Sequence, residues 1–161
     1  MILFFIEIIN FYDIILSTEG MIIMCYVDTV ILRKLESYVD FYAISESVYR
    51  GEVSKNNNVV DEKKDKLRKE KLSTRTSWVC ESVIDPIGLD RISTIFGILV
   101  VRRNEFDKCV TLLETEETNE PEETRLQCRD RVSAYNQMIT YITAKYGIKE
   151  PEPKTKKLKS N

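Results

Sequence analysis

Three segments of this chain repeat apolar residues at alternating steps of four and three, and this period constrains the fold more than any other feature. The segments begin at Ile31, Ile92 and Cys128. Such steps place side chains on one face of an α-helix. Helices with stripes of this period pack nearly parallel to one another, as in a bundle or a coiled coil. The 161-residue chain is therefore predicted to be mainly α, an irregular bundle of about four to five helices.

The first predicted helix covers residues 27–50, and Gly51 is expected to end it. Phe41, Ile44 and Val48 are expected to widen its apolar face. Either all three stripes form one core, or one of them faces another chain. The stripes are Ile31, Leu35, Tyr38, Tyr42, Ser45, Tyr49; Ile92, Phe96, Leu99, Arg103, Phe106, Val110, Leu113; and Cys128, Val132, Tyr135, Ile139, Ile142, Tyr146.

Start and stop signals frame the other two helices. Asp85 and Pro86 suit an N-cap and the first helical position of the second helix. Its first half, residues 95–101, has apolar residues on several sides and is expected to be the most buried element, although a buried strand would show the same run. The third helix is the clearest. It should cover residues 122–146 and end at Gly147.

The N-terminal segment, residues 1–16, is strongly apolar but carries Glu7, Asn10 and Asp13. These interruptions make it a poor membrane span, and sixteen residues are too few to cross a bilayer. No Lys or Arg precedes Arg33, which argues against a secretory signal. The three polar residues are spaced three apart, so on a helix they form one narrow stripe.

A helix is favoured for this segment. The alternative is an α+β fold in which residues 4–9 and 21–27 form a short hairpin around a turn at 17–20. In either form the apolar surface needs cover from protein, either within the fold or from a partner or second copy. The aromatic residues proposed for that contact are Phe4, Phe5, Phe11 and Tyr12.

A charged linker is expected at about residues 51–75. Within it, residues 61–72 hold six basic and four acidic side chains, which is typical of a solvated helix or a flexible linker. Residues 73–77 are expected to be a polar break. The lysines and arginine of segment 63–71 offer nucleic-acid binding as an alternative function, provided that they share a face with Arg102 and Arg103.

Trp78 is the only tryptophan. Burial is the favoured interpretation for its side chain. Exposed tryptophans are common interface anchors, so Trp78 is also a candidate partner-binding residue.

The C-terminal tail, residues 149–161, carries five lysines, two glutamates and two prolines. It is expected to be a disordered basic tail that follows a single domain at residues 1–148. It could make the chain more soluble, contact nucleic acid weakly, or serve as a nuclear-import signal. The candidate localisation or electrostatic residues are Lys154, Lys156, Lys157 and Lys159.

The residue types argue against most enzyme classes. Histidine is absent, which removes the commonest general base and most catalytic zinc sites. No glycine lies in a phosphate-binding loop. The four cysteines have no metal-ligand spacing and are expected to be reduced thiols in an intracellular compartment, cytoplasmic or nuclear. No catalytic residue, cofactor or metal is predicted. The favoured function is a non-catalytic protein–protein interaction module, a subunit or adaptor of a larger assembly.

Overall fold

A computed structural model describes residues 26–115 and 120–152, which form four α-helices and one 3-10 turn and contain no strand. The helices are α2 (Tyr26–Lys55), α3 (Glu62–Val83), α4 (Leu89–Thr115) and α5 (Glu122–Tyr146), with the turn η1 (Asp85–Ile87) between α3 and α4. The predicted mainly α bundle is confirmed. The hairpin alternative concerns residues 1–25, which lie outside the described part.

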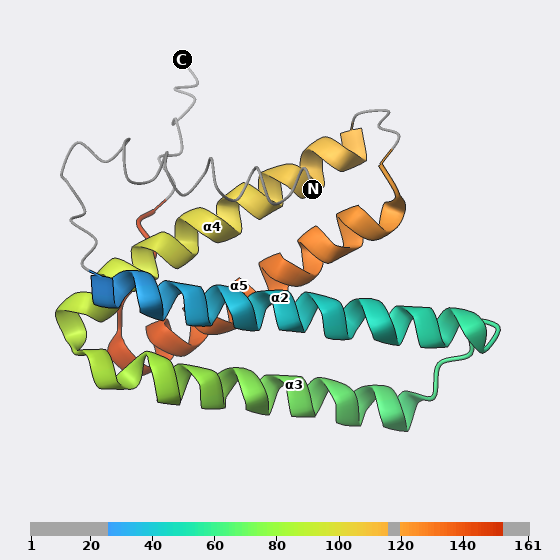
Figure 1. Cartoon of the computed structure of the whole chain (residues 1–161), viewed down its shortest axis with the longest axis horizontal. Helices are drawn as coiled ribbons and strands as arrows, with labels where there is room; N and C mark the ends of the chain where they lie inside the picture. The colour runs from blue at the N-terminus through green and yellow to red at the C-terminus, as the bar shows by residue number, and fades with distance from the viewer. Residues whose placement is uncertain (1–25, 116–119, 153–161) are drawn as a thin grey trace, which may run out of the picture.

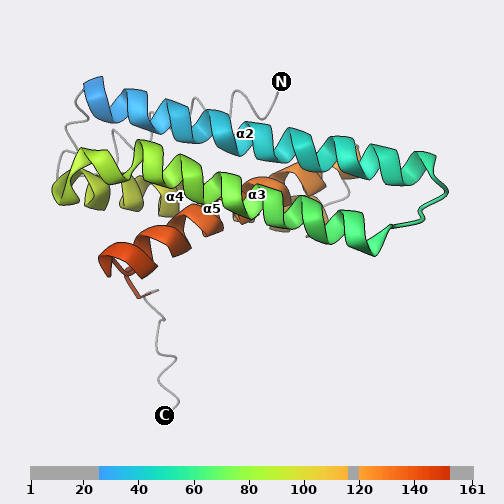
Figure 2. The same cartoon turned by 90° about the horizontal axis from the view of Figure 1, so that it is seen from below.

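Two helical hairpins cross to make the bundle (Figures 1 and 2). In one hairpin α2 and α3 lie side by side and antiparallel, and in the other α4 returns as α5. Helix α5 packs most extensively on α4 and also contacts α2 and α3. It is therefore the central element of the described core.

Helix α5 has the predicted bounds, 122–146, and the predicted end. Gly147 adopts a left-handed conformation with φ of 70°, and its amide donates to the carbonyl of Thr143 at 3.0 Å. Glycine adopts this conformation without steric cost, which is why it so often ends helices. The predicted stripe is buried at Cys128, Ile139 and Ile142.

Helix α4 is the most apolar element, and it is helical throughout, so the strand alternative for residues 95–101 is wrong. Its predicted stripe is buried at Ile92, Phe96 and Leu99. Ile95 and Ile98, on other sides of the helix, are buried as well. This confirms that the first half of the helix is deeply enclosed.

The expected N-cap role of Asp85 is wrong. Asp85 is the first residue of the 3-10 turn η1, and α4 begins four residues later at Leu89. The Asp85 carboxylate instead accepts hydrogen bonds from the hydroxyl groups of Tyr141 at 2.8 Å and Tyr146 at 2.5 Å, and from the ammonium of Lys145. Asp85 thus fastens the junction of α3 and α4 to the end of α5.

Helix α2 does not end at Gly51 but continues to Lys55. The chain turns instead at Asn57 and Asn58, whose φ angles are 56° and 59°. Asparagine is the residue other than glycine that most readily adopts this conformation. The asparagines were the true stop signal, and the prediction for Gly51 was wrong.

Helix α3 shows that residues 62–75 form a solvated helix rather than a flexible linker. Asp61 caps its start by accepting hydrogen bonds from the amides of Lys63 and Lys64. The expected polar break at 73–77 is wrong, because the helix runs through it. The hydroxyl of Thr76 lies 2.6 Å from that of Tyr38 on α2, so a polar residue of this stretch is satisfied inside the bundle.

Candidate interaction surface

Trp78 is exposed, contrary to the favoured interpretation of burial: 64% of its surface is accessible. The buried stripe of α3 consists of Leu72, Thr76 and Cys80. Trp78 follows Thr76 by two residues, which is about 200° around a helix, so it lies on the opposite face. A buried tryptophan covers about 150–250 Å², and Trp78 therefore leaves on the order of 100 Å² or more in solvent.

The exposed face of α3 combines apolar and basic side chains. Leu67 is 52% exposed, and it shares a helical stripe with Trp78. On α2, Phe41, Ile44 and Val48 are exposed, so they do not widen the buried face as expected. Phe41 and this stripe of α3 form what we call the apolar-basic surface, which consists of Phe41, Lys64, Leu67, Lys71, Arg75 and Trp78.

Two adjoining grooves connect these side chains. One, of about 610 Å³, lies on α3 between Leu67 and Trp78. The other, of about 340 Å³, lies between α3 and α2 and reaches Phe41. Leu67, Lys71 and Arg75 line both grooves, so the apolar-basic surface is continuous across the hairpin.

Electrostatically, the apolar-basic surface is positive. Lys64, Lys71 and Arg75 form no ion pair with a carboxylate among the described residues, and Glu70 is the single acidic side chain in the two linings. The guanidinium of Arg75 lies 4.9 Å from the ring centroid of Phe41, a cation–π contact that keeps it over the groove. These three cations are available to a ligand.

Two neighbouring cations of α3, Arg68 and Lys69, are paired with carboxylates. Arg68 forms ion pairs with Glu46 of α2 and with Asp65, and Lys69 also lies 3.1 Å from Asp65. Burial opposes the charged form of Arg68, but its hydrogen bonds to the two carboxylates raise its pKa. Only part of the basic segment 63–71 is therefore free to bind an anion.

Arg102 and Arg103 of α4 do not supplement the free positive charge of segment 63–71, because both are paired with carboxylates. Arg102 is buried and lies 3.1 Å from Glu36, and Arg103 lies 2.5 Å from Glu150. Each arginine thus holds parts of the bundle together. Because both arginines are paired with carboxylates, they offer less charge to a nucleic acid than the sequence suggested.

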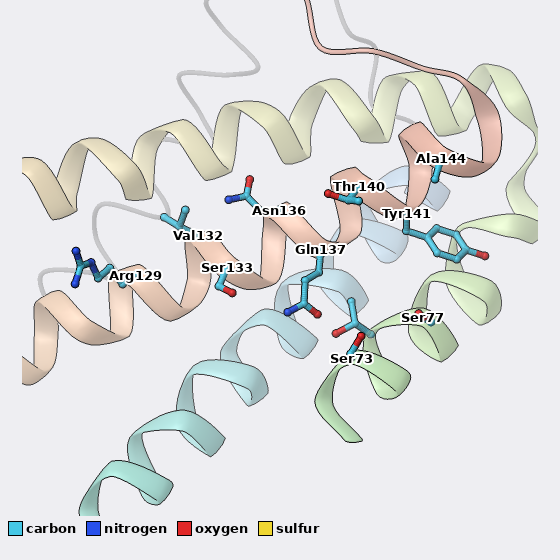
Figure 3. A pocket seen from close by; sticks show the side chains of 11 residues that line it. Ser73, Ser77, Arg129, Val132, Ser133, Asn136, Gln137, Thr140, Tyr141 and Ala144 are labelled. Atoms are coloured by element: carbon cyan, nitrogen blue, oxygen red, sulfur yellow. The ribbon is translucent and has the colours of Figure 1, made fainter. Parts of the chain in front are cut away.

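A third groove, of about 550 Å³, runs between α3 and α5 (Figure 3). Ser73 and Ser77 of α3 face Gln137 and Tyr141 of α5 across it. Its charged lining residue is Arg129, and the lining contains no carboxylate, thiol or amine from the described residues. Such a lining offers hydrogen bonds but no group that would act as a general base near neutral pH.

The described thiols are suited to packing rather than chemistry. Cys80 and Cys128 are buried, and Cys109 is partly buried. Burial raises the pKa of Cys80 to about 12, so this thiol remains protonated and a poor nucleophile at neutral pH. Within residues 26–115 and 120–152, no cluster of three or more potential ligand side chains is placed to hold a metal ion.

Of the candidate partner-binding and tail residues predicted from sequence, Trp78 alone lies in the described part. The N-terminal candidates Phe4, Phe5, Phe11 and Tyr12 and the tail lysines Lys154, Lys156, Lys157 and Lys159 lie outside it. The sequence reasoning missed Phe41, Lys71 and Arg75 as surface partners of Trp78. The signal was the stripe 67, 71, 75 and 78, which runs opposite the buried stripe 72, 76 and 80.

Comparisons with known proteins identify no relative. The chain matches no protein-family model, no curated protein and no solved structure. No helix in the described ranges has both the length and the apolar character needed to cross a membrane.

Proposed function

We propose that this chain is a non-catalytic helical interaction module, a subunit or adaptor that docks a protein partner through the apolar-basic surface. The exposure of Trp78 beside Leu67 and Phe41 supports the proposal most strongly. Aromatic anchors at the centre of an exposed patch supply most of the energy at protein interfaces, and arginine is also enriched there.

The bundle itself supplies a rigid platform for such docking. Tyr38 and Thr76 join α2 to α3 in the interior, and Arg68 and Glu46 join the same helices nearer the tip of the hairpin. Phe41 and Leu67 are therefore held at a fixed spacing before a partner arrives. Preorganised contacts of this kind lower the entropic cost of binding.

Nucleic-acid binding is the alternative, through segment 63–71 and the C-terminal lysines. Affinity for phosphates grows with the number of cations that release counterions. Two of the six cations in this segment, Arg68 and Lys69, are paired with carboxylates, which reduces the charge that is free to bind phosphates. We therefore place this function second.

The test is affinity capture with the full chain as bait, followed by quantitative mass spectrometry. Leu67 on α3 and Leu112 on α4 are a matched pair of sites, because each leucine is 52% exposed. The amount of partner captured should fall at least about tenfold with Trp78→Ala, and by less with Leu67→Ala, because each substitution removes an anchor. Capture should be unchanged with Leu112→Ala. Equal capture by all four proteins would refute the proposed docking surface.

A further inference from the structure

We infer that the partner segment bound at the apolar-basic surface is an acidic amphipathic helix, an inference that rests on the proposed function. Its apolar face would lie against Phe41, Leu67 and Trp78. Its carboxylates would meet the three cations of the surface. The geometry of the furrow, its charge and the unfavourable pairing of two copies lead to this conclusion.

The shape of the surface fits a helix. Two packed helices leave a furrow along their outer face, and a third helix can lie in it by packing ridges into grooves. Here the furrow between α2 and α3 has Phe41 on one side and Leu67 on the other. Leu67 and Trp78 are eleven residues apart on α3, or about 16 Å. An occupant helix of about three turns reaches both, with apolar residues spaced i, i+4, i+7 and i+11.

The charge of the surface selects an acidic occupant. Lys64 and Lys71 lie one turn to either side of Leu67, and Arg75 follows one turn later. Apolar and basic side chains therefore share the same stripe. A helix with glutamates or aspartates beside its apolar face would place a carboxylate near each cation, whereas a basic helix would be repelled.

A second copy of this chain fits the surface poorly. In a two-fold dimer the same patch meets itself. Such a pairing of α3 with α3 would bring the cations Lys64, Lys71 and Arg75 of one copy close to the same three cations of the other copy, and the two copies would repel. The linings of the two grooves contain one carboxylate, Glu70, to offset the charges of Lys64, Lys71 and Arg75. The occupant is thus expected to be a different protein.

The test uses Trp78, whose emission reports on this surface because the chain has no other tryptophan. Two synthetic helical peptides of equal length, without aromatic residues, share the same leucine positions and differ in carrying Glu or Lys beside them. Titrated into the full chain, the Glu peptide should shift Trp78 emission to shorter wavelength and should bind more weakly as salt is added. The Lys peptide should not shift it.

Charge reversal provides the decisive comparison. Lys71→Glu should weaken binding of the Glu peptide about 2- to 30-fold, because an exposed attraction is replaced by a repulsion of similar size. Lys71→Glu combined with Arg75→Glu should make the chain prefer the Lys peptide. Lys108→Glu is the control, because Lys108 is an exposed lysine on α4, outside the apolar-basic surface. It should not change the affinity for either peptide. Circular dichroism should show the helical content of wild type for every variant.

The inference would be overturned if the wild-type chain bound the two peptides equally, or bound the Lys peptide more tightly. It would also fail if neither peptide shifted the Trp78 emission. A titration with phosphatidylserine vesicles is run in parallel, and a shift with the vesicles alone would likewise overturn the inference. The proposed function has a separate test, since it fails only when capture of protein partners is insensitive to Trp78→Ala and Leu67→Ala. The two failures are therefore distinguishable.

Discussion

The sharpest test of the bundle compares one substitution at two isoleucines. Ile139 on α5 is 4% exposed, and Ile44 on α2 is 60% exposed. Isoleucine to alanine removes three carbon atoms, worth about 0.8 kcal/mol each when buried, or roughly 2.4 kcal/mol. The cavity left at Ile139 adds to this, so Ile139→Ala should lower the free energy of unfolding by about 2.5–5 kcal/mol.

Ile44→Ala is the matched control, because it deletes the same atoms from an exposed site on another helix. Its effect should be within about 0.5 kcal/mol. Both sites are helical, so the better helix propensity of alanine contributes to both variants and cancels in the comparison.

Urea unfolding followed by circular dichroism measures the difference. With a slope of about 2 kcal/mol/M, the midpoint for Ile139→Ala should fall by roughly 1–2.5 M, and that for Ile44→Ala should hardly move. Equal shifts for the two variants would contradict the burial assigned to α5.

Three further predictions concern other parts of the chain. Burial raises the pKa of Asp85, but hydrogen bonds from Lys145, Tyr146 and Tyr141 outweigh it and hold the pKa below its usual 3.8. The resulting stabilisation is present above about pH 4 and is lost as the pH falls through the folded-state pKa. Asp85→Asn should therefore lose less stability than wild type between pH 6 and pH 3 in urea titrations, and an unchanged loss would refute the role of this carboxylate. Cys80, whose pKa is about 12 rather than 9.0, should hold about a thousandfold less thiolate than an ordinary thiol at pH 8. Peptide mapping after iodoacetamide treatment should find Cys80 modified in urea and protected in buffer, and equal modification in both would contradict its burial. Deleting residues 151–161 should leave the melting temperature nearly unchanged, because Glu150 and its ion pair with Arg103 remain. A large fall in the melting temperature would show that the tail supports the fold.

The period of the apolar stripes was sufficient to predict the bundle. It located α4 and α5 because their stripes are long and buried, and in α5 the glycine at 147 has the left-handed conformation that glycine favours. Helix ends without such a requirement were predicted poorly. Gly51 lies within α2 and has open space around it, so nothing there forces the chain to turn.

Helix α3 was hard to predict because its composition is dominated by charge. Its buried stripe contains only Leu72, Thr76 and Cys80, and Thr76 is polar. The partner that makes Thr76 tolerable inside the bundle, the hydroxyl of Tyr38, is thirty-eight residues away in sequence. The pattern of residues within α3 cannot predict a hydrogen bond to a residue on another helix. For the same reason the sequence could not decide whether Trp78 faces the core or the solvent. The side of α3 that faces the core is set by how α3 packs on α2 and α5.

The candidate surface was predictable only in part. Trp78 was identified by its residue type, whereas Phe41 was assigned to the buried face of α2. Within that helix, Tyr38 and Tyr42 are buried and Phe41 is 40% exposed, although all three fit an apolar pattern. The choice among adjacent apolar faces is made by the packing of neighbouring helices, which periodicity alone does not reveal.

Docking of a protein partner on the apolar-basic surface is tested most directly by hydroxyl-radical footprinting of the free chain and of its purified partner complex. The readout is the oxidation rate of individual side chains, resolved by mass spectrometry. Trp78, Leu67 and Phe41 should be oxidised readily in the free chain and protected in the complex, while Leu112 on α4 is oxidised equally in both. Oxidation of Trp78 at the same rate in the free chain and in the complex would contradict the account.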